Sequence, residues 1–301
     1  MLGHIGRAAY GLYAIAAFVV VVLLLFCPLL IAAPFLPLRR QIGRLTVRAW
    51  LMSVGVRLKV SGLAHLPEGP CIVVCNHASY VDGIVLTAAL PVRVTFLVQH
   101  GAANWPYVGL VIRRMGVRFV NRELPRPAAR AMLGLIHHVR AGGSVAIFPE
   151  GAFRADPGLQ PFHAGAFLIA AKTGAPVVPA VMRGTRRFFH DGARWPRRSN
   201  FDIELFAPRN AHGPDRADAE DLANGVFEQM RRHCGEALSV PVEAESSLRR
   251  SIRRKAKDVR TNQRDSETDQ LGGIAAHQGL ISGGQDCVHA ACSFLRSGPV
   301  G

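Results

Sequence analysis

The segment CNHASYVD, residues 75–82, contains residues whose types and spacing could do chemistry. His77 follows an apolar run, and Asp82 comes five positions later. An imidazole titrates near ~6.5, so it can accept a proton at neutral pH. A carboxylate bonded to one ring nitrogen fixes the tautomer and leaves the other nitrogen as a base toward a hydroxyl. His77 and Asp82 are therefore candidates for a general-base pair.

The same residues also fit a purely structural role. Ser79 and Asp82 have the spacing of a capping box at the start of a helix, which would turn the carboxylate back toward His77. A helix cap beside a hydrogen-bonded loop histidine accounts for the same letters. Both interpretations stay open on this segment alone.

Polar residues follow three apolar runs that read as strands. Asn76 and His77 follow CIVVC, Arg122 follows GVRFVN, and Glu150 and Gly151 follow SVAIFP. In α/β sheets the groups at the carboxyl ends of strands converge on the ligand crevice. The sequence therefore predicts one site that combines a base, a cation and a carboxylate.

The elements that position these residues alternate between strand and helix patterns from Gly62 to Pro208. The expected strands are CIVVC, RVTFLV, VRFV, SVAIF and PVVPAV. The expected helices are SYVDGIVLTAAL, PAARAMLGLIHHVRAG and AGAFLIAAKTG, with one more at about 219–238. This alternation predicts an α/β fold with a mixed, largely buried sheet flanked by helices.

A long apolar segment precedes the sheet. Residues 8–38 carry no charge and exceed the ~20 residues needed to span a bilayer, which predicts an N-terminal membrane segment. Pro28, Pro34 and Pro37 interrupt its second half, so one spanning helix and two shorter helices that enter and return are both open. The next stretch, residues 44–56, fits either an amphipathic interfacial helix or a core-packed helix.

Charge around this segment predicts its orientation. Only Arg7 precedes it, whereas four arginines come within ten residues after its end: Arg39, Arg40, Arg44 and Arg48. The positive-inside rule places the chain beyond these arginines in the cytoplasm. The prediction is a protein of the inner membrane whose catalytic domain is cytoplasmic.

Composition limits the partners and the redox chemistry. The 36 Lys and Arg against 21 Asp and Glu give a formal charge of +15, which favours lipid headgroups, nucleic acid or phosphorylated substrates. The six cysteines show no paired CxxC spacing and no disulfide density, so we expect a reducing compartment and no metal site. Cys71 and Cys75 fall on one face of a predicted strand and read as a buried thiol pair.

Four segments, in order along the chain, are similar to the motifs of the glycerolipid (1-acyl-sn-glycerol-3-phosphate) acyltransferases. NHASYVD resembles their N-H-x4-D motif, and GVRFVNR, residues 116–122, resembles G-x-x-F-x-x-R. FPEG, residues 148–151, is similar to the third motif, and APVVPAVMRG, residues 175–184, to the fourth. The resemblance covers roughly Leu58 to Pro208, and the apolar N-terminus suits bacterial members that acylate lysophosphatidic acid.

The resemblance implies a role for each matched residue. His77 would act as general base on the acceptor hydroxyl, which attacks an acyl thioester, and Asp82 would orient the imidazole. Arg122 would bind the acceptor's phosphate through its fork of donors. Glu150 and Gly151 would shape the acceptor pocket. The remaining predicted substrate-binding residues come from the same motifs: Asn76, Gly116 and Phe119.

The resemblance also implies the reaction and its participants. The predicted enzyme is membrane-bound and acylates a lysophospholipid, with lysophosphatidic acid and phosphatidic acid as the first candidates for substrate and product. Acyl-CoA or acyl carrier protein would be the donor, with no further cofactor, and membrane lipids would be partners. Predicted boundaries are 1–57 for a membrane anchor and interfacial helix, 58–240 for the acyltransferase domain and 241–301 for a basic, disordered tail.

Two departures from the family pattern bear on the acceptor. The family often continues its third motif as E-G-T-R-S, but this chain has EGAFR, so the second cation is absent or displaced to Arg154. Gln99 stands where a lysine is common upstream of the second motif. With fewer matched phosphate contacts, another lysolipid is an alternative acceptor.

Two other functional classes compete with this interpretation. A non-catalytic lipid-binding protein could retain the sheet, but the intact His77 and Asp82 argue against it. A nucleic-acid-binding protein fits the charge, yet the basic run RRSIRRKAKDVR lacks interleaved aromatic residues and leaves the apolar segment unexplained. No nucleic-acid partner is expected.

Overall fold

The computed structural model describes residues 2–121, 125–152 and 158–235. The chain divides into two compact units, and every described residue belongs to the first of them. The predicted tail, residues 241–301, lies outside the described residues.

The described residues form a seven-stranded sheet in the order β1-β7-β6-β2-β5-β3-β4. The β6–β7 pair is antiparallel and the other neighbours are parallel, so the predicted mixed α/β sheet is confirmed. Its strands are β1 Leu58–Ser61, β2 Ile72–Cys75, β3 Val94–Gln99, β4 Arg118–Val120, β5 Ser144–Ile147, β6 Val177–Arg183 and β7 Phe201–Leu205.

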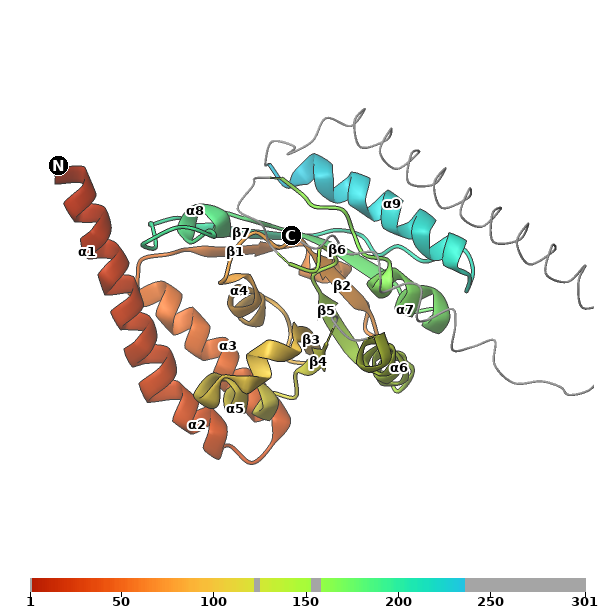
Figure 1. Cartoon of the computed structure of the whole chain (residues 1–301), viewed down its shortest axis with the longest axis horizontal. Coiled ribbons are helices and arrows are strands. Elements are labelled where there is room, and N and C mark those ends of the chain that lie inside the picture. The colour runs from red at the N-terminus through yellow and green to blue at the C-terminus, as the bar shows by residue number, and fades with distance from the viewer. Residues whose placement is uncertain (1, 122–124, 153–157, 236–301) are drawn as a thin grey trace, which may run out of the picture. The chain divides into compact units, whose positions relative to one another are not determined.

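Helices cover both faces of the sheet (Figure 1). One face packs against α3 Leu36–Ser53 and α4 Asp82–Ala89, and the other against α6 Pro125–Arg140, α7 Gly165–Thr173 and α9 Arg216–His233. Alternate residues of the central strand β2 therefore enter opposite cores. Cys71 and Cys75 lie in the first core with no exposed surface, as the sequence predicted.

Two strands and several short helices were not predicted. Strands β1 (LKVS) and β7 (FDIEL) are short and half-polar, because each faces a core on one side only. In β7, buried and half-buried residues alternate. The additional helices are α5 Pro106–Arg114, α8 Thr185–Phe188 and the 3₁₀ turns η2 Leu63–His65 and η3 His100–Asn104.

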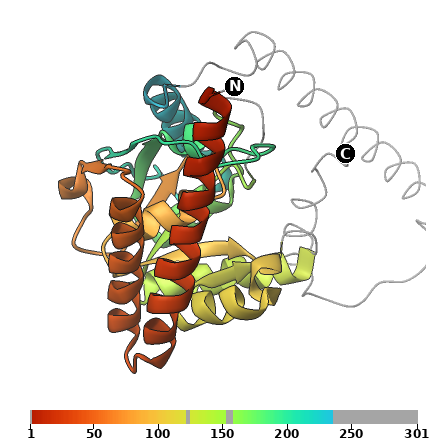
Figure 2. The ribbon, with the colours of Figure 1, turned by 90° about the vertical axis from the view of Figure 1, so that its left-hand side faces the viewer.

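The apolar N-terminus is one continuous helical run made of α1 Leu2–Ala17, the π-helical η1 Phe18–Phe26 and α2 Cys27–Ala32. Within it, Gly6–Ala32 is long and apolar enough to cross a membrane. Its most apolar window of 18 residues has a mean hydropathy of 3.2, and 17% of that window is buried. Helix α3 then runs back beside α1 (Figure 2).

Polar side chains attach this helical run to the rest of the unit along its length. Near its start, Tyr13 Oη donates to the Ser53 carbonyl at 2.7 Å, and Trp50 Nε1 donates to the Ala14 carbonyl at 3.3 Å. Further along, Tyr107 Oη of α5 donates to the Leu23 carbonyl at 2.7 Å. The apolar helix therefore lies along the catalytic unit.

One face of helix α3 packs into the core, as the core-packed reading of its sequence predicted, and an interfacial position for the other face stays a prediction. Its Val47, Trp50 and Leu51 are buried in the core, whereas Leu45 and Met52 are exposed. Its arginines bond to the sheet-bearing part of the unit: Arg40 Nε donates to the Met115 carbonyl at 2.9 Å, and Arg48 Nε donates to the Ala88 carbonyl at 3.0 Å. These arginines thus also hold α3 in place.

Candidate active site

Two neighbouring parallel strands bring the predicted site together. Strands β2 and β5 pair in register, so the residues just beyond their carboxyl ends lie side by side. The turn after β2 contains His77, and the loop after β5 contains Glu150. The backbone N–H of His77 donates to Glu150 Oε1 at 2.6 Å, which joins the two segments directly.

His77 and Asp82 form the predicted pair. His77 Nδ1 lies 2.9 Å from Asp82 Oδ2. The side chain of Asp82 is 1% exposed and that of His77 is 17% exposed, so the carboxylate lies behind the ring and the imidazole reaches the surface. Because an ionised carboxylate can only accept, Nδ1 is the donor and Nε2 is the basic nitrogen.

The Asp82 carboxylate also orders the turn that carries His77. Its Oδ2 accepts the backbone N–H groups of Ala78 at 2.6 Å and Ser79 at 2.8 Å. Its Oδ1 is buried and has no hydrogen-bond partner among the described residues. Three donors on one oxygen hold the carboxylate in a single orientation toward the imidazole.

The predicted capping box is only half formed. The N–H of Ser79 donates to Asp82, but helix α4 begins at Asp82, and the Ser79 side chain does not cap it. The N–H of Asp82 is instead directed to the Ser79 backbone carbonyl at 3.3 Å, in a tight turn. Ser79 Oγ accepts from the Val81 N–H at 3.3 Å and donates to the Phe189 carbonyl. The Ser79 hydroxyl therefore ties the turn to a distant loop.

Glu150 organises the opposite wall. It is 6% exposed, and its second oxygen, Oε2, accepts the backbone N–H of Gln160 at 2.7 Å. The carboxylate therefore links the His77 turn to the chain ten residues beyond. Gly151 comes next, in a turn with φ +86°, a left-handed conformation that favours glycine, and its N–H donates to the Phe148 carbonyl at 3.2 Å.

The ring of Phe148 supports the imidazole from one face. The ring centroids of His77 and Phe148 are 4.1 Å apart and the planes differ by 15°, which is a stacked arrangement. Together with the Asp82 bond, the stack fixes both the tilt and the rotation of the imidazole.

The sulfur of Cys75 lies in the core beneath this site. Burial raises the pKa of the Cys75 thiol well above its ordinary value, and the charges of Asp82 and Glu150 raise it further. A fully buried thiol with a raised pKa is a poor nucleophile. The Cys75 thiol is therefore a poor candidate for the chemistry, and proton transfer by His77 stays a prediction.

Asn76 has a clear structural position. It is 5% exposed, its Nδ2 donates to the Met182 carbonyl at 3.0 Å, and its Oδ1 accepts the Met182 N–H at 2.7 Å. These two bonds clamp the end of β2 to β6. Contact between Asn76 and substrate stays a prediction.

The second motif lies at the β4 edge, separated from β2 by β5 and β3. Gly116 ends the turn after α5 with φ +69°, and a Cβ there would lie 3.1 Å from Leu36 Cδ1. Phe119 is partly buried in β4, its ring edge-on to His100. Arg122 and Arg154 lie outside the described residues, so the phosphate-binding role of Arg122 stays a prediction.

Sequence patterns did not point to three contacts of the site. Phe148 lies in the FPEG segment, but its stacking on His77 joins two residues that are far apart in the sequence. Gln160 and Phe189 contribute only backbone groups, which leave no side-chain signal. Across residues 2–121, 125–152 and 158–235, no group of three His, Cys, Asp or Glu side chains could hold a metal ion.

Comparisons with known proteins agree with this geometry. Residues 57–183 match the family model described as Acyltransferase. The chain is 33% identical over 200 residues to the chloroplastic 1-acyl-sn-glycerol-3-phosphate acyltransferase BAT2 of Brassica napus, covering 64% of this chain and 57% of that protein. It is 30% identical over 185 residues to the putative 1-acyl-sn-glycerol-3-phosphate acyltransferase acl-1 of Caenorhabditis elegans, covering 61% and 70%.

A solved structure supports the fold. The crystal structure of the 1-acyl-sn-glycerophosphate (LPA) acyltransferase PlsC from Thermotoga maritima is similar with a TM-score of 0.63 and 22% identity, covering 77% of this chain and 95% of that one. The chain spans between 51% and 59% of the length of three of the curated relatives it matches.

Proposed function

This chain belongs to the 1-acyl-sn-glycerol-3-phosphate acyltransferase family, and we propose that it transfers a fatty acyl group from a thioester donor to lysophosphatidic acid, giving phosphatidic acid. One observation carries the proposal. His77 reaches the surface at the carboxyl ends of β2 and β5 with its Nδ1 bonded to the buried Asp82. This arrangement presents a basic nitrogen to an incoming hydroxyl.

The proposed reaction proceeds by direct attack. The acceptor hydroxyl loses its proton to Nε2 of His77 as its oxygen attacks the thioester carbonyl carbon. The tetrahedral intermediate then collapses, the C–S bond breaks, and the imidazolium returns the proton to the leaving thiolate. Asp82 stabilises the imidazolium during both steps. A thioester is already activated, so the proposal includes no cofactor beyond the donor, either acyl-CoA or acyl carrier protein.

The acceptor is tested by comparing lysolipids. Purified protein supplied with labelled acyl-CoA is expected to acylate lysophosphatidic acid faster than an uncharged monoacylglycerol of equal chain length. Charge-assisted hydrogen bonds contribute ~1.5–3 kcal/mol, so Arg122→Ala should lower kcat/KM for lysophosphatidic acid by at least about tenfold. The KM for the thioester should change much less. If the substitution weakens both acceptors equally, the phosphate assignment falls.

We also propose that the chain is bound to the inner membrane with its catalytic unit on the cytoplasmic side. The long apolar run Gly6–Ala32, mostly uncovered, supports membrane association, and the arginines after it support the orientation. A reporter enzyme that is active only in the cytoplasm should be active when it is fused after Arg260. Activity of an exported-only reporter at that position would contradict the orientation.

A further inference from the structure

A pocket of about 490 Å³ opens where α3 leads into β1, away from the His77 turn. Its described lining contains three guanidinium groups and no carboxylate, and we call it the arginine pocket: Gly55, Arg57, Arg187, Arg198, Ser199 and Asn200. In the described part of the chain, none of its arginines forms a salt bridge with an acidic side chain. Three cations that share one pocket without a counter-charge favour an anionic ligand.

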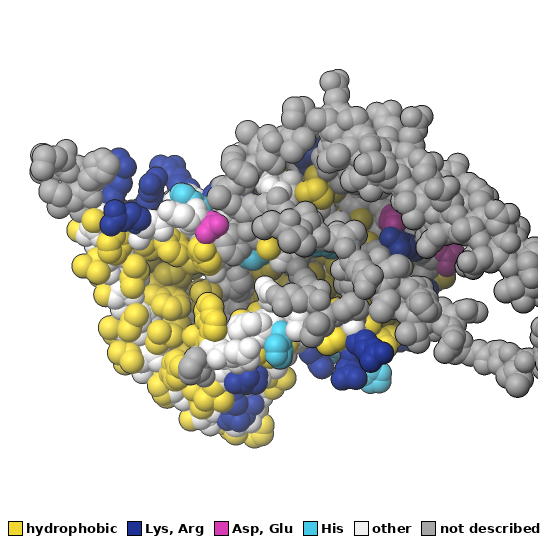
Figure 3. All heavy atoms as spheres, viewed as in Figure 1, with side chains coloured by type: hydrophobic (Ala, Val, Ile, Leu, Met, Phe, Trp, Pro, Cys, Tyr) yellow, Lys and Arg dark blue, Asp and Glu magenta, His cyan; other side chains and the backbone are white. Residues whose placement is uncertain are grey.

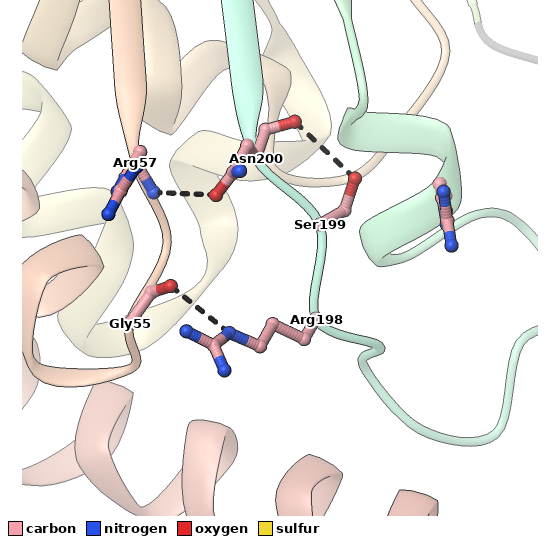
Figure 4. A pocket seen from close by; sticks show the side chains of 6 residues that line it. Gly55, Arg57, Arg198, Ser199 and Asn200 are labelled. Carbon is pink, nitrogen blue, oxygen red and sulfur yellow. Dashed lines mark hydrogen bonds between the residues drawn. The ribbon is translucent and has the colours of Figure 1, made fainter.

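The walls of the arginine pocket are fixed by bonds between distant parts of the chain (Figure 4). The N–H of Arg57 donates to Asn200 Oδ1 at 3.1 Å, and the Phe201 N–H donates to the Arg57 carbonyl at 2.8 Å. Arg198 Nε donates to the Gly55 carbonyl at 3.3 Å. Because these bonds already position the walls, little further ordering is needed when an anion binds.

Gly55 allows the close approach of one guanidinium. Its φ is +68°, and a Cβ at this position would lie 3.3 Å from Arg198 Nη2. A glycine with a left-handed backbone thus lets the Arg198 head lie against the chain. The contact holds one cation at the wall of the arginine pocket.

The surroundings of the arginine pocket are apolar and aromatic. Met52 is 79% exposed and Tyr13 51%, and Tyr13 Oη is bonded to the carbonyl of Ser53, two residues before Gly55. Trp195, 38% exposed, lies against α1, since a Cβ at Gly11 would be 2.6 Å from Trp195 Cβ. Tyr and Trp are the residues enriched at the level of lipid headgroups.

Helices α1, α2 and α5 carry an extended apolar surface. Figure 3 shows hydrophobic side chains gathered over α1, α2 and α5, with Lys and Arg at the edges of this area. Leu12, Leu24 and Leu25 of the apolar helix are all more than half exposed. If this surface enters lipid, an adjacent cationic pocket lies at the depth of the phosphate groups.

We propose that the arginine pocket, whose lining contains no residue of the His77 turn, binds the phosphate group of an anionic membrane phospholipid. A lipid is favoured over a soluble anion because exposed apolar and aromatic side chains come close to the lining along the chain. Met52 precedes Gly55 by three residues, Trp195 precedes Arg198 by three, and Tyr13 is bonded to the Ser53 carbonyl. The inference concerns binding and stands whether or not the acyl-transfer proposal holds.

The arginine pocket is connected to the active site through the loop between α8 and β7. The Arg197 N–H donates to the Phe188 carbonyl at 2.8 Å. On the next residues of that loop, the Phe189 carbonyl accepts from Ser79 Oγ, and Asp191 Oδ1 accepts from Tyr80 Oη at 2.8 Å. A lipid held in the pocket therefore sets how the His77 turn faces the membrane surface.

A second pocket provides a matched control. It measures about 250 Å³ along α9 and its lining includes Glu228, which is paired with Arg231 at 2.7 Å. Among the described residues that follow Trp195 in the sequence, which include α9, no large hydrophobic side chain is exposed. Three exposed arginines can be neutralised to remove the same charge. Arg209 and Arg232 line this pocket, and Arg216 is the first residue of α9.

The test measures quenching of Trp195 by vesicles that contain brominated phosphatidylglycerol, with full-length protein carrying Trp105→Phe. The pocket variant replaces Arg57, Arg187 and Arg198 with Gln, and the control variant replaces the three arginines near α9 with Gln. Each arginine near a lipid surface contributes about fivefold in affinity, so the pocket variant should bind about a hundredfold more weakly than the control. Vesicles of phosphatidylcholine alone should not distinguish the two variants.

Several outcomes overturn the proposal. Equal affinity of both triple variants for anionic vesicles would do so. If millimolar inorganic phosphate displaces the vesicles, soluble phosphate is the ligand. If the pocket variant still binds vesicles but no longer binds an acidic acyl carrier protein, the pocket binds the donor. Arg187→Gln alone guards against misfolding, because the Arg187 side chain forms no hydrogen bond within the described residues. This single change should weaken vesicle binding about fivefold.

Discussion

His77→Ala is expected to lower the rate of acyl transfer by about 10²–10⁴-fold, the usual contribution of a positioned general base. The imidazole is the group at the site that is both oriented by a buried carboxylate and exposed to an acceptor. Initial rates with lysophosphatidic acid and labelled acyl-CoA measure the effect on purified, detergent-solubilised protein.

The matched control for this substitution is His212→Ala. His212 is exposed and lies on the chain before α9, so its loss should leave the rate unchanged. The midpoint of thermal unfolding should stay close to wild type in both variants. Turnover near the wild-type rate in His77→Ala would remove the base from the mechanism.

Asp82→Asn is expected to lower the rate by about 10³–10⁴-fold, as it does in other enzymes where a buried aspartate fixes the tautomer of a histidine base. The amide has no negative charge to stabilise the imidazolium. If its NH₂ faces His77, the donor moves to the wrong side of the bond and Nε2 becomes the protonated nitrogen. The basic nitrogen toward the acceptor is then lost.

This variant also tests the structural role of Asp82. Its Oδ2 accepts the N–H groups of Ala78 and Ser79 as well as His77 Nδ1, so some stability should be lost with the charge. Chemical denaturation gives that cost separately from the rate, with the exposed Asp221 of α9 changed to Asn as the control. A folded Asp82→Asn protein that turns over normally would show that the carboxylate only holds the turn.

The centre of the fold and the catalytic pair could be predicted because local patterns specify them. Strands β2 and β5 are buried on both faces, so they appear as continuous apolar runs. Their parallel neighbours bring His77 and Glu150 to one edge by topology alone. Spacing within one turn then places Asp82 beside His77.

The contacts that escaped prediction depend on distant backbone. The sequence predicts that the Ser79 hydroxyl caps the helix that follows it, but the hydroxyl donates to the Phe189 carbonyl instead. This partner is brought close only by the tertiary structure. Glu150 binds two N–H groups, and every residue except proline has one, so its partners His77 and Gln160 carry no signal. Strand β1 pairs with β7, and its four half-polar residues have no pattern that predicts a strand without that partner.

The pairing of β1 with β7 also determines the order in which the protein can assemble during synthesis. Arg57 and Asn200, which join at this edge, are 143 residues apart. At ~5–20 residues per second, a ribosome needs about 7–29 s to supply the second strand after the first. Throughout that interval the apolar run Gly6–Ala32 has already left the ribosome, while the β1 edge beside it is still open. The nascent chain therefore presents its most apolar helix to the membrane before its sheet is complete.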